Sequence, residues 1–158
     1  MTIENLLPET RNAVRALIVK NDRVLMLRKD GGERGEGFAL PGGSQDPGET
    51  LHEALERECF EELGARVVIR DLLHVADFFK QKRTEPPATR HQVEFLFSCS
   101  LPAEYRPGNG PRPDRTQIEV VWVPLGELPG LNFHMASMAP LLGYLSNRHR
   151  GVYLGLIG

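Results

Sequence analysis

Two short apolar runs near the start of the chain predict a β-hairpin. Asn12 to Val19 and Arg23 to Arg28 are rich in aliphatic residues, and Lys20 to Asp22 joins them. Asn and Asp tolerate the backbone of a tight turn, so the two runs are expected to pair as antiparallel strands. Alternation along the first strand places on one face the side chains of Val14, Ala16 and Ile18.

A helix is predicted from Leu51 to Leu63, because signals for both of its ends are present. Thr50 suits the N-cap position, and Glu53 three residues later completes a capping box, in which each residue bonds the backbone N–H of the other. Gly64 follows the last helical residue, where a left-handed backbone ends many helices. Local chemistry therefore predicts where this helix begins and ends.

The remaining pattern is mostly that of strands and loops. Further strands are expected at Phe38 to Leu40, Arg66 to Lys80 (long or broken), His91 to Leu101 (half-buried) and Ile118 to Leu125. Loops are expected at Lys29 to Gly37, Lys82 to Arg90 and Pro102 to Pro113, with a short turn or helix at Gly126 to Leu131. An amphipathic helix is expected from Met135 to Arg148, with apolar residues at Met138, Leu141, Leu142 and Leu145.

Strands around a central helix, with a second helix near the end of the chain, predict an α/β or α+β sandwich. A chain of 158 residues has room for one domain with an adequate core, so a single domain over residues 1–158 is expected. Neither an internal repeat nor a linker in the sequence indicates a second domain.

Charge and composition favour an ordinary soluble globular protein. The net charge of −2 gives no basic field for DNA or a membrane, and no apolar run reaches the roughly 18 residues of a membrane span. The first residues lack the features of a secretory signal. Cys59 and Cys99 lie in apolar patterns and are expected to be reduced core residues. A cytoplasmic location is therefore expected.

Three acidic residues of the predicted helix lie where they destabilise it. Glu58, Glu61 and Glu62 crowd the C-terminal end, where the helix dipole favours cations. Glu58 and Glu62 also repel each other at i,i+4 spacing. On a helical wheel all three project from the edge of the leucine-bearing face. They form either a solvated acidic helix end or a site for a hard divalent cation such as Mg²⁺, which takes oxygen ligands.

The residues around these acids resemble the Nudix box. Its pattern is Gly, five residues, Glu, seven residues, then Arg-Glu-apolar-x-Glu-Glu-x-Gly-apolar, matched here by Gly43, Glu49, Arg57, Glu58, Cys59, Glu61, Glu62, Gly64 and Ala65. The seven fixed residues would coincide by chance in roughly one window in 10⁸. The resemblance implies the Nudix fold, an α/β/α sandwich with a mixed β-sheet. It also implies Mg²⁺-dependent hydrolysis of a diphosphate linkage in a nucleoside diphosphate derivative.

The same resemblance implies a metal site. Glu58 and Glu62 would be the principal metal ligands, with Glu61 sharing ligation or serving as the base. Gly42 and Gly43 would lie beside the metal and contribute a backbone carbonyl. Mg²⁺ is the expected cofactor, with Mn²⁺ as a substitute. The ion would neutralise a pyrophosphate and lower the pKa of a coordinated water.

Arg57 and Glu49 are expected to support this site. Arg57 is not a ligand, but it can reach Glu53 or Glu61 at i±4 spacing. By resemblance, Arg57 orients a catalytic glutamate, a role that typically changes activity by about one or two decades. Glu49 precedes the N-cap and is expected to brace the loop against Arg57.

Candidates for substrate binding outside the box are less specific. Arg15 interrupts an apolar strand face, and either reaches a substrate anion or pairs with an acid at the sheet edge. Arg28 either meets a polyphosphate or is a solvated charge, and His91 is either a substrate contact or a partly exposed residue at a strand end. Glu119 and Asp114 are candidates for the additional ligand or base that many relatives take from outside the box.

Two other functions share these features. A Nudix-like module could sense a nucleotide or metabolite without hydrolysis, although such modules commonly lose box glutamates that this chain keeps. An enzyme acting on capped RNA ends would need a basic groove to bind the RNA backbone, and the near-neutral net charge argues against such a groove. The expected partner is a small nucleotide substrate, with neither DNA nor a membrane expected, and a homodimer is left open.

Overall fold

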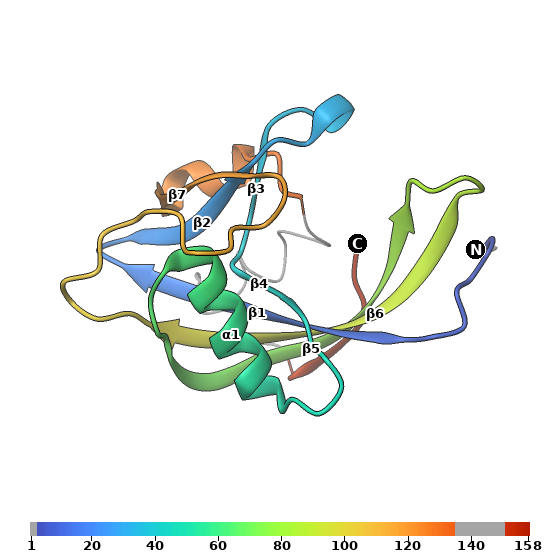
Figure 1. The fold of residues 1–158 in the computed structure, drawn as a ribbon, viewed down its shortest axis with the longest axis horizontal. Coiled ribbons are helices and arrows are strands. Elements are labelled where there is room, and N and C mark those ends of the chain that lie inside the picture. The colour runs from blue at the N-terminus through green and yellow to red at the C-terminus, as the bar shows by residue number, and fades with distance from the viewer. Residues whose placement is uncertain (1–2, 135–150) are drawn as a thin grey trace.

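The computed structural model describes residues 3–134 and 151–158, which form a mixed α+β fold (Figure 1). This part of the chain contains one α-helix, α1 (Leu51–Leu63). The strands are β1 (Arg11–Lys20), β2 (Arg23–Lys29), β3 (Gly37–Ala39), β4 (Gly42–Ser44), β5 (Val68–Lys82), β6 (Ala88–Ser100), β7 (Gln117–Pro124) and β8 (Tyr153–Leu156). Short 3-10 helices cover Gly32–Arg34 and Leu125–Gly130.

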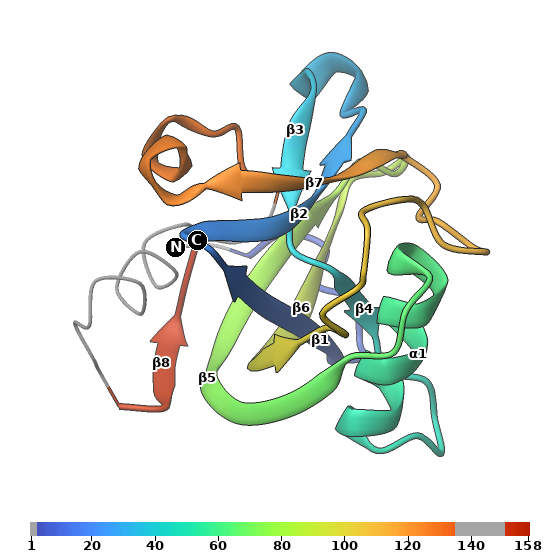
Figure 2. The same cartoon turned by 90° about the vertical axis from the view of Figure 1, so that its left-hand side faces the viewer.

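The strands form one mixed sheet that is splayed into two halves. Its order is β3-β2-β1-β6-β5-β8, with β4 also paired to β1 and β7 to β2. The β1–β6 and β5–β8 pairs are parallel, and the others are antiparallel. The register of β1 against β2 consists of two pairs beside their turn, Val19 with Val24 and Lys20 with Arg23. Strands β2, β3 and β7 therefore diverge from β1, β6 and β5 (Figure 2).

Two apolar clusters, one on each face of β1, build the core. The first packs β1 against α1 and includes Val14, Leu55 and Cys59. The second lies between β1 and the half of the sheet that contains β2 and β7, and it includes Leu17 and Leu128. Because successive side chains of a strand point to opposite faces, β1 contributes to both clusters.

Several predicted elements are confirmed. The bounds of α1 are those predicted, and β1 and β2 enclose the predicted hairpin strands. The turn residues Asn21 and Asp22 have φ angles of 50° and 59°, as a tight hairpin turn requires. The strand predicted at 118–125 and the short helix predicted at 126–131 are each displaced by one residue. Cys59 and Cys99 are buried free thiols, as expected.

The prediction of a loop from Lys82 to Arg90 is wrong. Strand β5 continues to Lys82 and β6 begins at Ala88, so residues 83–87 alone connect them. The two strands pair as far as Lys82 and Ala88, and we call this paired part of β5 and β6 the arm. Leu6 of the N-terminal segment adds a parallel bridge to Thr89. Backbone pairing thus outweighs the loop-like composition of this stretch.

Two other strand predictions need correction. β6 is not half-buried, because Phe97 packs in the first cluster and Leu96, on the supposedly polar face, packs in the second; Leu96 is 2% exposed. The short strands β4 and β8 were not predicted at all. β4 is a strand because it pairs with β1, and β8 is a strand because it pairs with β5.

The mixed α+β class is confirmed, while the second helical layer of the predicted sandwich is not described. The helix predicted from Met135 to Arg148 lies outside the described residues. Within 3–134 and 151–158, no helix has the length and apolar character needed to cross a membrane.

Candidate active site

Helix α1 begins and ends with the local structures that its sequence predicts. Thr50 Oγ1 accepts a hydrogen bond from the Glu53 N–H at 3.1 Å, and the Glu53 carboxylate accepts one from the Thr50 N–H at 3.4 Å. Gly64 ends the helix with a left-handed φ of 74°. Between these caps the helix packs on the core, and this orientation brings Glu58 and Glu62 against β4.

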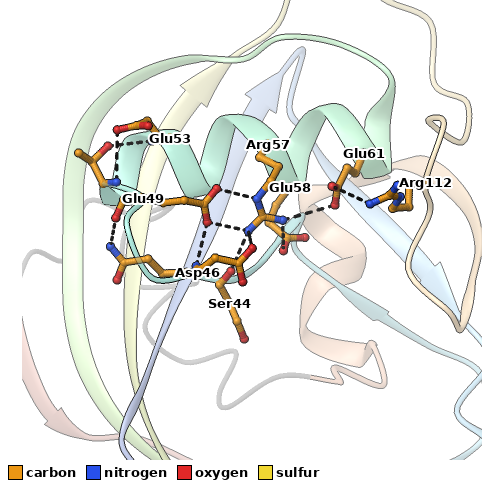
Figure 3. Close-up of polar contacts among 10 residues, drawn as sticks. Ser44, Asp46, Glu49, Glu53, Arg57, Glu58, Glu61 and Arg112 are labelled. Atoms are coloured by element: carbon orange, nitrogen blue, oxygen red, sulfur yellow. Dashed lines mark hydrogen bonds and ion pairs between the residues drawn. The ribbon is translucent and has the colours of Figure 1, made fainter.

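Arg57 is the centre of a polar network along α1 (Figure 3). Its Nε and Nη2 donate to the two carboxylate oxygens of Glu49 at 2.7 and 3.0 Å, which is a bidentate contact. Nη2 also donates to the Ser44 carbonyl at 3.0 Å. Nη1 donates to Glu58 at 3.0 Å and to Glu61 at 3.5 Å. The guanidinium therefore ties the loop before the helix to the acids near the end of the helix.

Glu49 is the closest acidic partner of Arg57. The hydrogen bonds from Arg57 are the main reason why the pKa of Glu49 lies below its usual range, and the Asp46 N–H adds a bond at 2.8 Å. The expected brace between Glu49 and Arg57 is thus present as a contact. Of the two helical partners predicted for Arg57, Glu61 is in contact, while Glu53 bonds the N-cap.

Glu62 is the most buried acid of the helix. It is 4% exposed, and its Oε1 accepts a hydrogen bond from the Gly42 N–H at 2.8 Å. Burial raises the pKa of Glu62 to about 8, although the Gly42 N–H and the charge of Arg15 act in the opposite direction. Because a metal ligand must be deprotonated, a cation bound here would compete with the proton on Glu62.

The glycine pair Gly42–Gly43 allows two close approaches, of Glu58 to β4 and of β4 to β1. A Cβ on Gly43 would lie 2.5 Å from the carboxylate carbon of Glu58, and a Cβ on Gly42 would lie 1.9 Å from the Val14 carbonyl oxygen. Gly42 also has a φ of 140°, which other residues rarely adopt. Burial raises the pKa of Glu58, and the hydrogen bond from Arg57 opposes that shift. A larger residue at Gly43 would push Glu58 away from the sheet, and one at Gly42 would clash with the backbone of β1.

The donor chemistry at this edge of α1 suits a hard divalent cation. Glu58, Glu61 and Glu62 offer carboxylate oxygens, and none of the three turns out into bulk water, with side-chain exposures of 17% and 22% for the first two. Within the described residues, no group of three or more His, Cys, Asp or Glu side chains has an arrangement that could hold a metal ion. Arg57 contacts Glu58 and Glu61, and the Gly42 N–H contacts Glu62, so in this arrangement the acids are held by groups of the protein itself.

The substrate candidates outside the box do not gather at these acids. Arg28 Nε pairs with Glu119 at 2.8 Å across β2 and β7, and its Nη1 pairs with Glu36 at 2.5 Å. His91 Nε2 lies 2.7 Å from Asp77 Oδ1 on the arm formed by β5 and β6. Arg28 and Glu119 therefore belong to one ion-pair cluster, and His91 belongs to another.

Arg15 is the substrate candidate with an electrostatic link to the box. It lies on β1 opposite Gly42, and its Nη1 is 3.5 Å from the Leu40 carbonyl oxygen. Its positive charge lowers the pKa of both Glu58 and Glu62 against the effect of burial. A bound anion near these carboxylates would therefore feel the charge of Arg15.

Two charged members of the network were not predicted. Asp46 Oδ2 lies 3.5 Å from Arg57 Nη2, and Arg112 Nη1 lies 3.9 Å from Glu61 Oε1. The Asp-Pro-Gly turn directly before Glu49 is a local signal that could have indicated Asp46. Arg112 lies in a proline-rich loop far along the chain, and no local pattern marks it.

The comparison with known families decides the family. A family model described as the NUDIX domain matches residues 9–142. The chain belongs to the NUDIX domain family. A curated relative of this NUDIX domain, the nucleoside triphosphatase NudI of Enterobacter sp., is 46% identical over 55 residues, which cover 33% of this chain and 39% of the relative. The chain spans about two fifths of the length of the curated relatives that it matches.

Solved structures share the fold of this NUDIX domain. A NUDIX hydrolase from Nitrosomonas europaea superposes with a TM-score of 0.71 and 24% identity, covering 93% of this chain and 78% of the other. An ADP-ribose pyrophosphatase from Streptococcus suis superposes with a TM-score of 0.61 and 19% identity, covering 92% and 97%. At these identities the likeness shows the fold alone.

Proposed function

We propose that the chain hydrolyses a diphosphate linkage in a nucleoside diphosphate derivative, with Mg²⁺ as cofactor and Mn²⁺ as a substitute. The observation that carries the proposal is the placement of Glu58 and Glu62 against the Gly42–Gly43 pair, with Arg57 bonded to both Glu58 and Glu61. The names of two similar proteins, a nucleoside triphosphatase and an ADP-ribose pyrophosphatase, support it, since both names describe hydrolysis of phosphate anhydrides.

The proposed metal ligands are the acids of the box. Glu58 and Glu62 are the principal ligands, Glu61 is a further ligand or the base, and the Gly42–Gly43 backbone supplies a carbonyl. A divalent cation bound there neutralises the charge of the pyrophosphate and makes water a better nucleophile. The mutual repulsion of the acids, which the protein now offsets with Arg57 and the Gly42 N–H, favours such a cation.

The other roles in the proposed reaction belong to side chains of the box, as base and as positioning residues. A water oxygen bonds to one phosphorus while the bond from that phosphorus to the bridging oxygen breaks, and the bridging oxygen leaves with the other product. Glu61, where it serves as the base rather than as a ligand, takes the proton from the attacking water. Arg57 holds Glu61 and Glu58 in position, and Glu49 holds Arg57.

Among the substrate candidates, Arg15 has the strongest support. Its charge acts on Glu58 and Glu62, so it lies where a phosphate held beside these acids would be attracted. Arg28 and Glu119 already pair with each other, and His91 pairs with Asp77, so a substrate would have to replace these partners. Roles for Arg28, His91 and Glu119 stay predictions.

A substrate panel tests the proposal. Purified protein with Mg²⁺ is incubated with nucleoside triphosphates, nucleotide sugars, ADP-ribose and dinucleoside polyphosphates, and the products are separated by chromatography. We expect cleavage of at least one compound at a diphosphate linkage. Glu58→Gln should lose most of that turnover. Glu56 is exposed on the same helix, so the control variant Glu56→Gln should retain the turnover. Near-normal turnover in Glu58→Gln would contradict the ligand assignment.

The same panel separates the alternatives. Binding of a nucleotide without turnover of any compound would favour the sensing module. Strongly salt-dependent binding of RNA would favour an enzyme of RNA ends. A single domain over residues 1–158, a cytoplasmic location and the absence of DNA and membrane partners stay predictions, and a homodimer stays open.

A further inference from the structure

A distant loop caps the C-terminal end of α1. We call residues 105–117 the clamp loop. The Arg112 N–H donates to the Glu61 carbonyl at 3.0 Å, and the Gly110 N–H donates to the Glu62 carbonyl at 3.0 Å. Two further bonds, from Gln117 Nε2 and Tyr105 Oη, reach the carbonyls of Glu62 and Leu63. The clamp loop thus satisfies carbonyls that the end of a helix leaves free.

The clamp loop is held close to the helix at several points. A Cβ on Gly110 would lie 2.5 Å from the Glu61 carbonyl oxygen, so only glycine permits this approach. Lys29 Nζ pairs with Asp114 Oδ2 at 2.8 Å and fastens the loop to β2. The position of the loop relative to the acids of α1 is therefore well defined.

Arg112 has an exposed guanidinium beside these acids, and most of its N–H donors have no partner within residues 3–134 and 151–158. Its backbone is fixed by the bond to Glu61 and by its place between Pro111 and Pro113, which restrict the backbone on both sides. Its side chain is 82% exposed and forms one ion pair among the described residues, with Glu61 at 3.9 Å. Figure 3 shows the guanidinium directed toward Glu61 from beyond the end of α1.

Two other cations near the acids are already engaged by acidic side chains, while Arg15 donates to the Leu40 carbonyl at 3.5 Å. Arg57 donates to Glu49, Glu58 and Ser44. Lys29 is paired with Asp114. A guanidinium that keeps its donors free can bind a phosphate through two parallel hydrogen bonds. Arg112 meets this condition, and its backbone bond to Glu61 fixes its distance from the acids.

We propose that Arg112 binds a phosphate group of the substrate while the diphosphate lies at the acids of α1. This inference rests on the proposed function for the position of the diphosphate. On binding, the guanidinium exchanges its long contact with Glu61 for a bidentate contact with the phosphate. Arg112 is thus a substrate-binding residue, brought to the site by the clamp loop.

Binding of a non-hydrolysable probe tests this inference. The affinity of α,β-methylene-ADP is measured by calorimetry, with Mg²⁺ present, for the wild type, Arg112→Ala, Arg112→Lys and the control Arg115→Ala. Arg115 is exposed in the same loop and forms no ion pair with a described residue. We expect Arg112→Ala to weaken binding about tenfold, Arg112→Lys to restore part of the loss, and Arg115→Ala to bind like the wild type. The melting temperature should not change in any variant, because the capping bond uses the Arg112 backbone.

Kinetics separate this inference from the proposed function. On any compound that the wild type cleaves, Arg112→Ala should raise KM about tenfold and leave kcat within about threefold. If the wild type cleaves a compound and Arg112→Ala changes neither KM nor probe affinity, the inference is wrong and the proposed function stands. If the wild type cleaves nothing but binds the probe through Arg112, the proposed function fails, and Arg112 is a phosphate-binding residue of a site that does not hydrolyse its ligand. A wild type that neither cleaves a compound nor binds the probe would contradict both.

Discussion

Glu62 combines properties that a surface acid does not have. It is 4% exposed, and its hydrogen bond comes from the Gly42 N–H at 2.8 Å rather than from a cation. Burial raises the pKa of Glu62 to about 8, so this carboxyl is mostly neutral at pH 7 when no metal is bound. A cation at this site must displace the proton, and metal affinity should therefore rise with pH.

Glu62→Gln should remove a pH dependence of stability from the metal-free protein. The pKa of Glu62 is about 8 when folded and about 4.5 ordinarily, so the free energy of unfolding falls as pH rises through this window. Gln keeps an oxygen for the Gly42 N–H and carries no charge. In denaturant unfolding with EDTA, the wild type should lose on the order of a few kcal/mol across this window, and Glu62→Gln should lose less.

Glu56→Gln is the control for this measurement. Glu56 is exposed on the same helix, so its removal should leave the pH profile of the wild type unchanged. Identical profiles for Glu62→Gln and the wild type would mean that Glu62 is solvated in solution. Glu62→Gln should also bind Mg²⁺ more weakly, because it has lost a charged oxygen ligand.

Arg57→Lys should reduce turnover almost as much as Arg57→Ala. The bidentate contact with Glu49, at 2.7 and 3.0 Å, uses two N–H groups in one plane, while a third nitrogen reaches Glu58. A lysine ammonium cannot make these contacts at once. Steady-state kinetics on a substrate from the panel should show kcat lower by about one to two decades, with KM changed less. An unchanged kcat with a raised KM would instead make Arg57 a substrate-binding group.

At the scale of elements, the bounds of α1 could be predicted from local sequence, but the strand β4 and the path of the clamp loop could not. The signals for α1 are Thr50, Glu53 and Gly64, all adjacent to its ends, so local chemistry decides its bounds. β4 (Gly42–Ser44) becomes a strand because β1 lies beside it. The contact of Arg112 with Glu61 depends on the path of the clamp loop, which no local pattern specifies.

The same distinction holds for the candidate site. The resemblance to the box pointed to the acids and Arg57, and all of them lie on one helix, so a local motif could identify them. Arg28 is a candidate for the substrate and Glu119 one for the additional ligand or base, but the register of β2 against β7 places them opposite each other. Strand register is a long-range property, so this ion pair could not be read from either segment alone.

Gly110→Ala should destabilise the protein through the end of α1. The added Cβ would lie 2.5 Å from the Glu61 carbonyl oxygen and 2.6 Å from the Gly64 nitrogen, so the clamp loop must move away from the helix. Overpacking of this kind typically costs about 1–3 kcal/mol. Denaturant unfolding should show that loss. Gly108→Ala, in the same loop with open space around its Cβ, should change stability by less than about 0.5 kcal/mol.

For the molecule as a whole, the chain near its C-terminal end is tied to the arm formed by β5 and β6. Strand β8 runs parallel to β5, and Asp77 of β5 accepts hydrogen bonds from both Tyr153 and His91. The hydrogen bond from Tyr153 is the main reason why the pKa of Asp77 lies below its usual range, and His91 adds to it. The contribution of Asp77 to stability is therefore present above its ordinary pKa and is lost as pH falls through the lower folded value.

Tyr153→Phe should loosen β8 without disturbing the acids of α1. The substitution keeps the ring and removes the hydroxyl that bonds Asp77, while the backbone bonds Val75 N–H to Val152 O and Ile157 N–H to Asp77 O, at 2.8 and 2.9 Å, can still form. Hydrogen exchange followed by mass spectrometry should show faster exchange in peptides that cover 151–158, and unchanged exchange in α1 as an internal control. Equal exchange of β8 in the variant and the wild type would mean that backbone pairing alone holds the strand. Asp77 would then serve the arm through His91.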